Sequence, residues 1–295
     1  NDNIILDIEF MDTKRFPGRE NVESFNRLLS FKLRRLPAYD AVIVADDAAL
    51  LYAVAHIGDL FKNIPVFYCG INDYSMAASL DRSFPVRGVI ERVSISDTLE
   101  LIRRLFPQRV KLAVITDGTV SARADMKSFL SILKNFSFAV DILSLENLTF
   151  DRLNMNLKKL GDEWSILLFS AYTDADGTTR LFQDELDDLA RNSSVPVFHL
   201  WEHGIGEGIL GGKVVFHFEQ GRAAAEMVLR YLHGAPVAEI DNISESPNRY
   251  CFDYNQLKKF NVSLSQLPEG SIVLNKPLSF YKKGILNRGE FFPLK

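Results

Sequence analysis

The chain has 295 residues, 47% of them hydrophobic, and a formal net charge of -4 at pH 7. This length supports a large core and favours two lobes over one. Acidic and basic side chains are interspersed without a basic stripe, which argues against nucleic acid as a partner. No apolar run reaches the roughly 18 residues that a membrane span requires, and no signal-peptide pattern opens the chain.

Strand-like and helix-like segments alternate along most of the chain. Residues Ile4 to Phe10 alternate as a strand does, and apolar residues at helical spacing predict a helix over 20–35. Ala41 to Ala45 is a short apolar run typical of a buried parallel strand. This alternation predicts parallel sheets with right-handed crossovers. Further strands are expected at 65–69, 86–90, 111–115, 139–143, 165–169 and 196–200, with helices at 47–61, 96–106, 123–136, 150–160 and 178–191.

The strand–helix pattern restarts near Arg109, and the strands are too many for one comfortable sheet. The predicted fold is therefore α/β, with two doubly wound parallel-sheet lobes joined by a hinge. From Asp241 onward the periodicity fades into short pieces that tie the lobes together. We place lobe 1 at 1–93 plus about 219–246, lobe 2 at 94–218, a hinge-crossing segment at 247–281 and a tail at 282–295.

The segment 195–234 is the most informative part of the sequence. An apolar strand there ends in aromatic, imidazole and charged side chains. A Gly-rich loop, a strand at 213–218 and a helix from Gly221 follow. In doubly wound sheets, ligands bind outside the carboxyl ends of the strands. The residues at these ends are Asp46, Asp47, Cys69, Gly70, Asn72, Tyr74, Glu91, Thr116 to Thr119, Ser170 to Tyr172 and Trp201 to His203. Among them, the candidate ligand-binding residues are Asp46, Asp47, Cys69, Gly70, Asn72, Thr116, Asp117, Ser170, Tyr172, Trp201 and Glu202.

Other roles compete for several of these residues. Helix capping is an equally good explanation for Asp46, Asp47 and Thr116. Aromatic packing at a lobe interface is the alternative for Tyr172 and Trp201. The sequence therefore predicts a binding edge without separating the residues that touch a ligand from those that support it.

Catalytic and metal chemistry find little support in the sequence. His199, His203 and His217 with Glu202 suggest metal ligands, but an i, i+4 spacing at a strand end does not converge as it does on a helix. No nucleophile elbow and no phosphate-binding loop is present. We expect no catalytic residue, no metal and no cofactor. Two buried apolar thiols are the expected state of the cysteines, Cys69 and Cys251.

Stretches across nearly the whole chain resemble type I periplasmic binding proteins. The resemblance is to the ABC-transporter substrate-binding-like domains that serve as extracytoplasmic sensors in bacterial membrane histidine kinases and diguanylate cyclases. It rests on FMDTKR, YDAVIVADDAAL, IPVFYCGIND, RGVIERVSISDTLELIRRLFP, LAVITDGT, VPVFHLWEHGIGEGILGGKV, QGRAAAEMVLRYLHG and the segment from SPNRYCFDYNQL through LPEGSIV to PLSFY. It implies two lobes that close on a small ligand, an amino acid or aromatic carboxylate, with the strand-end residues around the cleft.

The same resemblance implies partners and a location. It places 247–281 close to the membrane and connects the domain to a membrane-anchored signalling module. It also implies that the domain lies in the periplasm as part of an inner-membrane protein. Whether the protein forms a homodimer is left open. The family normally begins with one more strand and helix, so the first strand–helix unit of lobe 1 is expected to be absent here. The alternatives are a solute-binding protein of an ABC importer for an amino-acid-like ligand, and an α/β hydrolase or transferase using Asp46, Asp47, Glu202 and His203.

Overall fold

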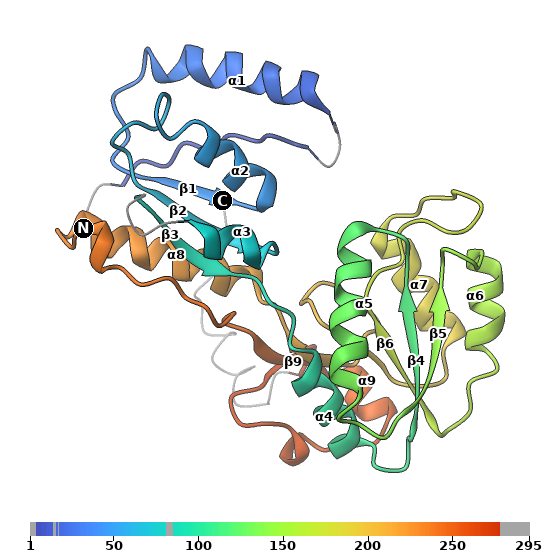
Figure 1. The fold of residues 1–295 in the computed structure, drawn as a ribbon. Helices are drawn as coiled ribbons and strands as arrows, with labels where there is room; N and C mark the ends of the chain where they lie inside the picture. The colour runs from blue at the N-terminus through green and yellow to red at the C-terminus, as the bar shows by residue number, and fades with distance from the viewer. Residues whose placement is uncertain (1–3, 14–15, 17, 81–84, 278–295) are drawn as a thin grey trace, which may run out of the picture. The chain divides into compact units, whose positions relative to one another are not determined.

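The computed structural model describes residues 4–13, 16, 18–80 and 85–277, and the chain divides into two compact units (Figure 1). The first unit comprises residues 1–92 and 217–247, and the second comprises 93–216 and 248–295. The chain therefore passes between the units after Arg92, after Phe216 and after Pro247. The predicted tail at 282–295 lies outside the described residues.

The first unit is a three-stranded parallel sheet of order β1-β2-β3 with helices on both faces. Alternate residues of β2 point to opposite faces, as in any strand. Val66 and Tyr68 pack in one cluster with α1 and α2, whereas Phe67 and Cys69 pack toward α8. Its elements are α1 (Arg19–Leu33), β1 (Val42–Ala45), α2 (Asp47–Ala55), β2 (Val66–Ile71), α3 (Tyr74–Ser79), β3 (Val86–Ile90), α8 (His217–Leu232) and a 3-10 turn at Val237–Glu239.

The strand predicted for Ile4 to Phe10 is wrong, because these residues form no strand in the structure. A strand requires a hydrogen-bonded neighbour, and in the described part of the chain β1 pairs with β2 alone. Residues 4–10 are instead held by side chains: the Tyr39 hydroxyl donates to Asp7 (2.7 Å) and the Lys32 ammonium pairs with Glu9 (2.7 Å). The alternation of apolar and polar residues was therefore not enough to form a strand without a neighbouring strand to pair with.

The second unit is a seven-stranded sheet of order β10-β9-β8-β7-β6-β4-β5. All neighbouring pairs are parallel except β8 and β9. No helix among the described residues of either unit is both long and apolar enough to cross a membrane. The elements of this unit are α4 (Ile95–Leu105), β4 (Lys111–Thr116), α5 (Val120–Leu133), β5 (Ala139–Ser144), α6 (Phe150–Leu157), β6 (Trp164–Leu168), α7 (Phe182–Asn192), β7 (Val197–His199), β8 (Gly211–Val214), β9 (Arg249–Asp253), α9 (Tyr254–Lys259), a 3-10 turn at Leu264–Gln266 and β10 (Ile272–Leu274).

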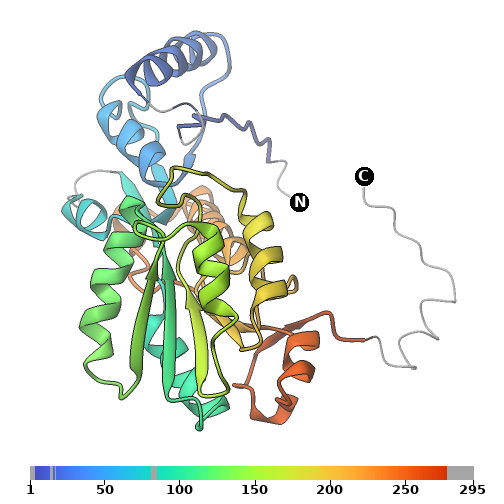
Figure 2. The ribbon, with the colours of Figure 1, turned by 90° about the vertical axis from the view of Figure 1, so that its right-hand side faces the viewer.

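The two faces of this sheet carry separate cores. Ala113 and Ile115 of β4 pack with α6 and α7 on one face (Figure 2). Leu112 and Val114 pack with α4, α5 and α9 on the other face. Strands buried on both sides read as continuous apolar runs, which explains why the sequence located them well. The predicted α/β fold with two parallel-sheet lobes is confirmed.

The boundaries predicted within 195–234 need correction. β8 begins at Gly211 rather than at Lys213, and α8 begins at His217 rather than at Gly221. A Cβ atom at Gly212 would lie 2.1 Å from the carbonyl oxygen of His199, so only glycine lets β8 approach β7 this closely. Gly211 and Gly212 therefore belong to the strand, whereas Gly204, Gly206 and Gly208 lie in the turns before it.

Candidate functional site

In the first unit, the carboxyl ends of all three strands meet around Gly70. Gly70 has a φ of 64°, a left-handed conformation that glycine adopts without strain. A Cβ atom built on it would lie 3.6 Å from the backbone nitrogen of Asp46 and 3.7 Å from a carboxylate oxygen of Glu91. Residues after β1, β2 and β3 are thus brought together, as the strand-end prediction requires.

Both aspartates that follow β1 accept hydrogen bonds from backbone N–H groups. Asp46 is the N-cap of α2, and its carboxylate accepts the N–H of Asp47 (2.7 Å). One carboxylate oxygen of Asp47 accepts the N–H groups of Asn72 and Asp73, both at 3.1 Å. Burial raises the pKa of Asp47, and the two backbone hydrogen bonds act in the opposite direction. Asp47 therefore ties the loop after β1 to the loop after β2.

Of the two candidate residues Cys69 and Asn72, the first is buried and the second is exposed. Cys69 is buried and free, and burial, followed by the charge of Glu91, raises the pKa of its thiol. A thiol that stays protonated is a poor nucleophile, so Cys69 contributes shape and polarisability instead. The second cysteine, Cys251, is also buried and free. Asn72 is exposed, with its backbone held by Asp47.

In the second unit, the carboxylate of Asp117 joins two loops that follow neighbouring strands. It is buried, and one oxygen accepts the N–H (3.0 Å) and the hydroxyl (2.7 Å) of Thr119. The other oxygen accepts the N–H of Tyr172 at 3.0 Å. Thr119 in turn caps α5 by accepting the N–H of Ala122. Asp117 thus positions the loop after β6 against the loop after β4.

This arrangement holds Tyr172 by its backbone and leaves its ring exposed. Its N–H donates to Asp117, its carbonyl accepts the N–H of Arg180 (2.9 Å), and its side chain is 39% exposed. Nearby in sequence, the Ser170 hydroxyl is buried and makes no hydrogen bond to the described residues. An unpaired buried hydroxyl is costly unless another group supplies the bond. Thr116 is also buried, on the last position of β4.

Trp201 and Glu202 follow β7 in a more enclosed setting. Trp201 is half-buried, packs against the core and lies 5.4 Å from the ring of His199 and 6.3 Å from that of His203, between ring centroids. The backbone N–H of Glu202 donates to Val215 (3.1 Å). Trp201 therefore packs against the core of its own unit, whereas Tyr172 is 39% exposed.

The histidine pair beside Trp201 is a structural contact. Burial, followed by the neighbouring His203, lowers the pKa of His199 to about 3, so the ring is neutral at physiological pH. His199 Nδ1 donates to the carbonyl of Leu168 (2.8 Å), and its Nε2 faces His203 Nε2 at 3.2 Å. In the part of the chain that the structure describes, no three His, Cys, Asp or Glu side chains group as a metal site would need.

Gln220 is a supporting residue that the strand-end prediction missed. Gln220 is 2% exposed on α8 and accepts the N–H of Gly70 at 3.3 Å. The two residues are separated by 150 positions, so no local pattern could join them. A glutamine on the sheet-facing side of an amphipathic helix was the one available signal.

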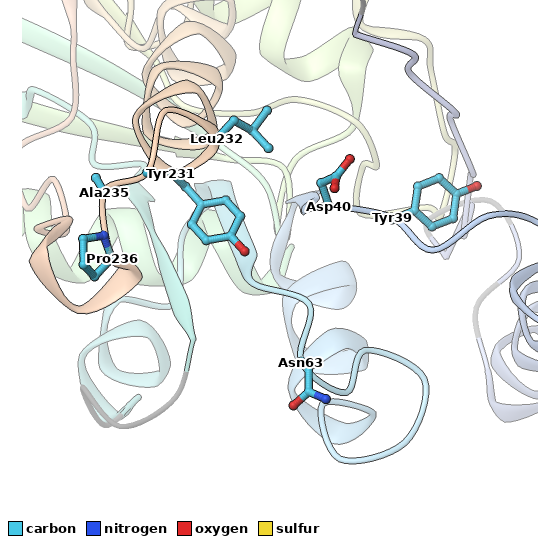
Figure 3. A pocket seen from close by; sticks show the side chains of 8 residues that line it. Tyr39, Asp40, Asn63, Tyr231, Leu232, Ala235 and Pro236 are labelled. Carbon is cyan, nitrogen blue, oxygen red and sulfur yellow. The ribbon is translucent and has the colours of Figure 1, made fainter.

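A surface cavity of about 530 Å³ lies elsewhere in the first unit (Figure 3). Its lining comes from the chain before β1, the chain before β2 and the end of α8, which places it at the amino ends of the strands. None of the predicted site residues lines it. We therefore assign the ligand edge from the strand ends and not from this cavity. Its lining residues are Tyr39, Asp40, Asn63, Tyr231, Leu232, Gly234, Ala235 and Pro236.

Comparisons with known proteins identify the family. Residues 26–267 match the model of the ABC transporter substrate binding protein family. Among solved structures, the ligand-free, open form of a substrate-binding protein with adhesive properties from Clostridium difficile has a TM-score of 0.64 at 16% identity, covering 88% of this chain and 84% of that one. An ABC domain from Streptococcus pneumonia in complex with L-Trp has a TM-score of 0.54 at 16% identity, covering 84% and 85%.

A conserved domain protein from Vibrio cholerae has a TM-score of 0.54 at 14% identity, covering 83% of this chain and 82% of that one. At these identities the likeness concerns the fold alone. None of the curated proteins gives a match. The family match covers most of the chain and describes ligand-binding proteins rather than enzymes. The chain belongs to the ABC transporter substrate binding protein family.

Proposed function

We propose that this chain binds a small amino-acid-like molecule with its strand-end residues, as the extracytoplasmic sensor domain of a membrane signalling protein. The observation that carries the binding proposal is Tyr172, whose exposed ring stands on a backbone fixed by Asp117 and Arg180. A rigid aromatic surface loses little entropy when a planar group stacks on it. The neighbouring Ser170 hydroxyl would gain the partner that it lacks among the described residues.

The charges at the two edges suit the two ends of an amino acid. The first unit gathers Asp46, Asp47 and Glu91 around Gly70, which favours an ammonium group. In the second unit, α5 begins at Val120 directly after the candidate residues. The amino-terminal end of a helix stabilises a carboxylate through its free N–H groups and dipole. We infer that the strand ends of the first unit suit an ammonium group and those of the second unit suit a carboxylate.

The sensor role is supported by the carboxyl-terminal resemblance rather than by the site. FDYNQL, LPEGSIV and PLSFY resemble the end of a sensor domain just before a membrane span. Delivery to an ABC importer is the competing role. Measuring the output of the parent protein and the uptake of the same ligand, with and without the Tyr172→Ala substitution, separates them. Loss of output at unchanged uptake supports the sensor; loss of uptake alone contradicts it.

The ligand class can be tested with three related compounds. Isothermal titration should detect binding of L-tryptophan, which serves as the probe because the pneumococcal structural neighbour holds it. Tryptamine lacks the carboxylate and indole-3-propionate lacks the amine. Each is expected to bind at least about ten-fold more weakly, since a charged group without its partner costs more than about 1.4 kcal/mol. Equal affinity for all three would contradict recognition of both charges.

The Tyr172→Ala variant is expected to weaken the Kd of L-tryptophan about ten-fold, because a stacked aromatic pair contributes roughly 0.5–1.5 kcal/mol beyond its buried area. Its free energy of unfolding should fall by no more than about 1–2 kcal/mol, since Tyr172 is 39% exposed. Tyr172→Phe should retain binding. Leu181→Ala is the matched control, because Leu181 is 73% exposed in the same connection between β6 and α7. Equal binding by Tyr172→Ala and this control would remove Tyr172 from the site.

A further inference from the structure

One buried side chain of the first unit contacts three separate chain segments. Gln220 of α8 accepts the N–H of Gly70 at the end of β2 (3.3 Å). Its amide nitrogen donates to the carbonyl of Ile90 at the end of β3 (3.1 Å) and to the hydroxyl of Ser246 (2.8 Å). With 2% exposure, its amide is shielded from water, so these bonds have no ready substitute.

These contacts lie beside every passage of the chain between the units. Ile90 precedes the first passage after Arg92, and Ser246 precedes the last one after Pro247. Gln220 itself follows the remaining passage after Phe216. All three connecting segments are therefore tied within the first unit by one side chain.

The segment that holds Ser246 is itself bound to β3. Ile243 N–H donates to the carbonyl of Gly88 (2.9 Å), and Ile90 N–H donates to the carbonyl of Ile243 (3.2 Å). In the second unit, the Asn248 amide donates to the Ser94 hydroxyl (2.8 Å) and joins the continuations of the same two segments. Hydrogen bonds thus join all three connecting segments in the first unit and two of them again in the second.

We propose that Gln220 is a positioning residue that clamps the Gly70 loop of the ligand edge to the three segments connecting the units. Given the proposed function, a ligand that contacts Gly70 and its neighbours acts through this clamp on the segments that lead into the second unit. A helix residue thereby links ligand binding to the connections without touching the ligand.

Amide hydrogen exchange in the ligand-free protein tests the clamp. Gln220→Met keeps the length of the side chain but removes all three hydrogen bonds. Exchange over 67–73, 86–93 and 241–248 is expected to rise about ten-fold, because local opening becomes easier where these bonds are lost. Residues 111–116 of β4 should be unchanged. Ser246→Ala, which removes a single partner, should raise exchange over 241–248 most.

The control for stability is Met227→Ala, a substitution at a buried, sheet-facing position of the same helix. Met227 packs with Phe67, Ile240 and Ile243, so this variant should raise exchange over 67–73 and 241–248 but leave 86–93 near the rate of the parent. The same pattern in both variants, or a rise confined to α8, would overturn the clamp. Titration of Gln220→Met with L-tryptophan should show about ten-fold weaker binding, the expected cost of lost preorganisation. Failure of the parent protein to bind L-tryptophan would count against the proposed ligand only, since exchange alone decides the clamp.

Discussion

Glu185→Gln is expected to raise the free energy of unfolding by roughly 3 kcal/mol at pH 8 and to leave it nearly unchanged at pH 4. Glu185 lies on α7 with a fully buried side chain, and neither carboxylate oxygen makes a hydrogen bond to the described residues. Arg180 is 3.6 Å from one oxygen, but it also pairs with Asp188. Burial raises the pKa of Glu185 to about 7, the charge of Asp188 adds to this, and Arg180 opposes it.

The direction of the pH effect follows from the two states of the chain. The carboxyl group holds its proton up to about pH 7 when folded but only up to its ordinary value of 4.5 when unfolded. Between these values unfolding releases a proton, so stability falls as the pH rises. The difference of about 2.5 pH units corresponds to roughly 3 kcal/mol at about 1.4 kcal/mol per unit. Glutamine has the shape of the protonated carboxyl group but does not ionise, so the variant does not lose this stability as the pH rises.

Urea denaturation of both proteins from pH 4 to pH 8 measures the effect. Asp187→Asn is the matched control, because it removes a charge from an exposed position of the same helix and should shift stability by less than about 0.5 kcal/mol. Parallel stability curves for the parent and Glu185→Gln would show that Glu185 does not titrate in this range. His199 contributes equally to the pH dependence of both proteins, so its contribution cancels in the difference between their stability curves.

The sheets could be predicted from sequence because their strands are buried on both faces. Ala113 and Leu112 face different cores, so β4 appears as an unbroken apolar run. Residues 4–10 show the opposite case, in which a convincing alternation has no strand partner among the described residues. Strand formation depends on a neighbour distant in sequence, which periodicity alone does not reveal.

The residue types of the candidate site could be predicted from the sequence, but the hydrogen bonds that join these residues could not. The strand-end reading named Asp47, Gly70 and Asp117, which lie at the carboxyl edge of their sheets. The hydrogen bond from Tyr172 to Asp117 spans 55 residues, and that from Gly70 to Gln220 spans 150. Such contacts follow from the folded topology. Whether a residue such as Asp117 serves the ligand or the loops could only be addressed with the structure.

Asp117→Ala is expected to lower the free energy of unfolding by at least about 4.5 kcal/mol, because each of three hydrogen bonds to a charged acceptor contributes at least about 1.5 kcal/mol. The buried carboxylate accepts three of them, two from Thr119 and one from Tyr172. Its loss leaves the N–H of Tyr172 without this partner and loosens the backbone beneath the exposed ring. L-tryptophan binding should weaken in the same variant.

Chemical denaturation measures this cost against two controls. Asp141→Ala removes an aspartate from an exposed position of β5 and should shift stability by less than about 0.5 kcal/mol. Thr119→Ala removes one hydrogen bond to Asp117 and the cap of α5, and should cost at least about 2.5 kcal/mol. A cost for Asp117→Ala no larger than that of Thr119→Ala would mean that the bond to Tyr172 stabilises nothing. Tyr172 would then be a mobile ring rather than a fixed platform, and the binding proposal would lose the observation that carries it.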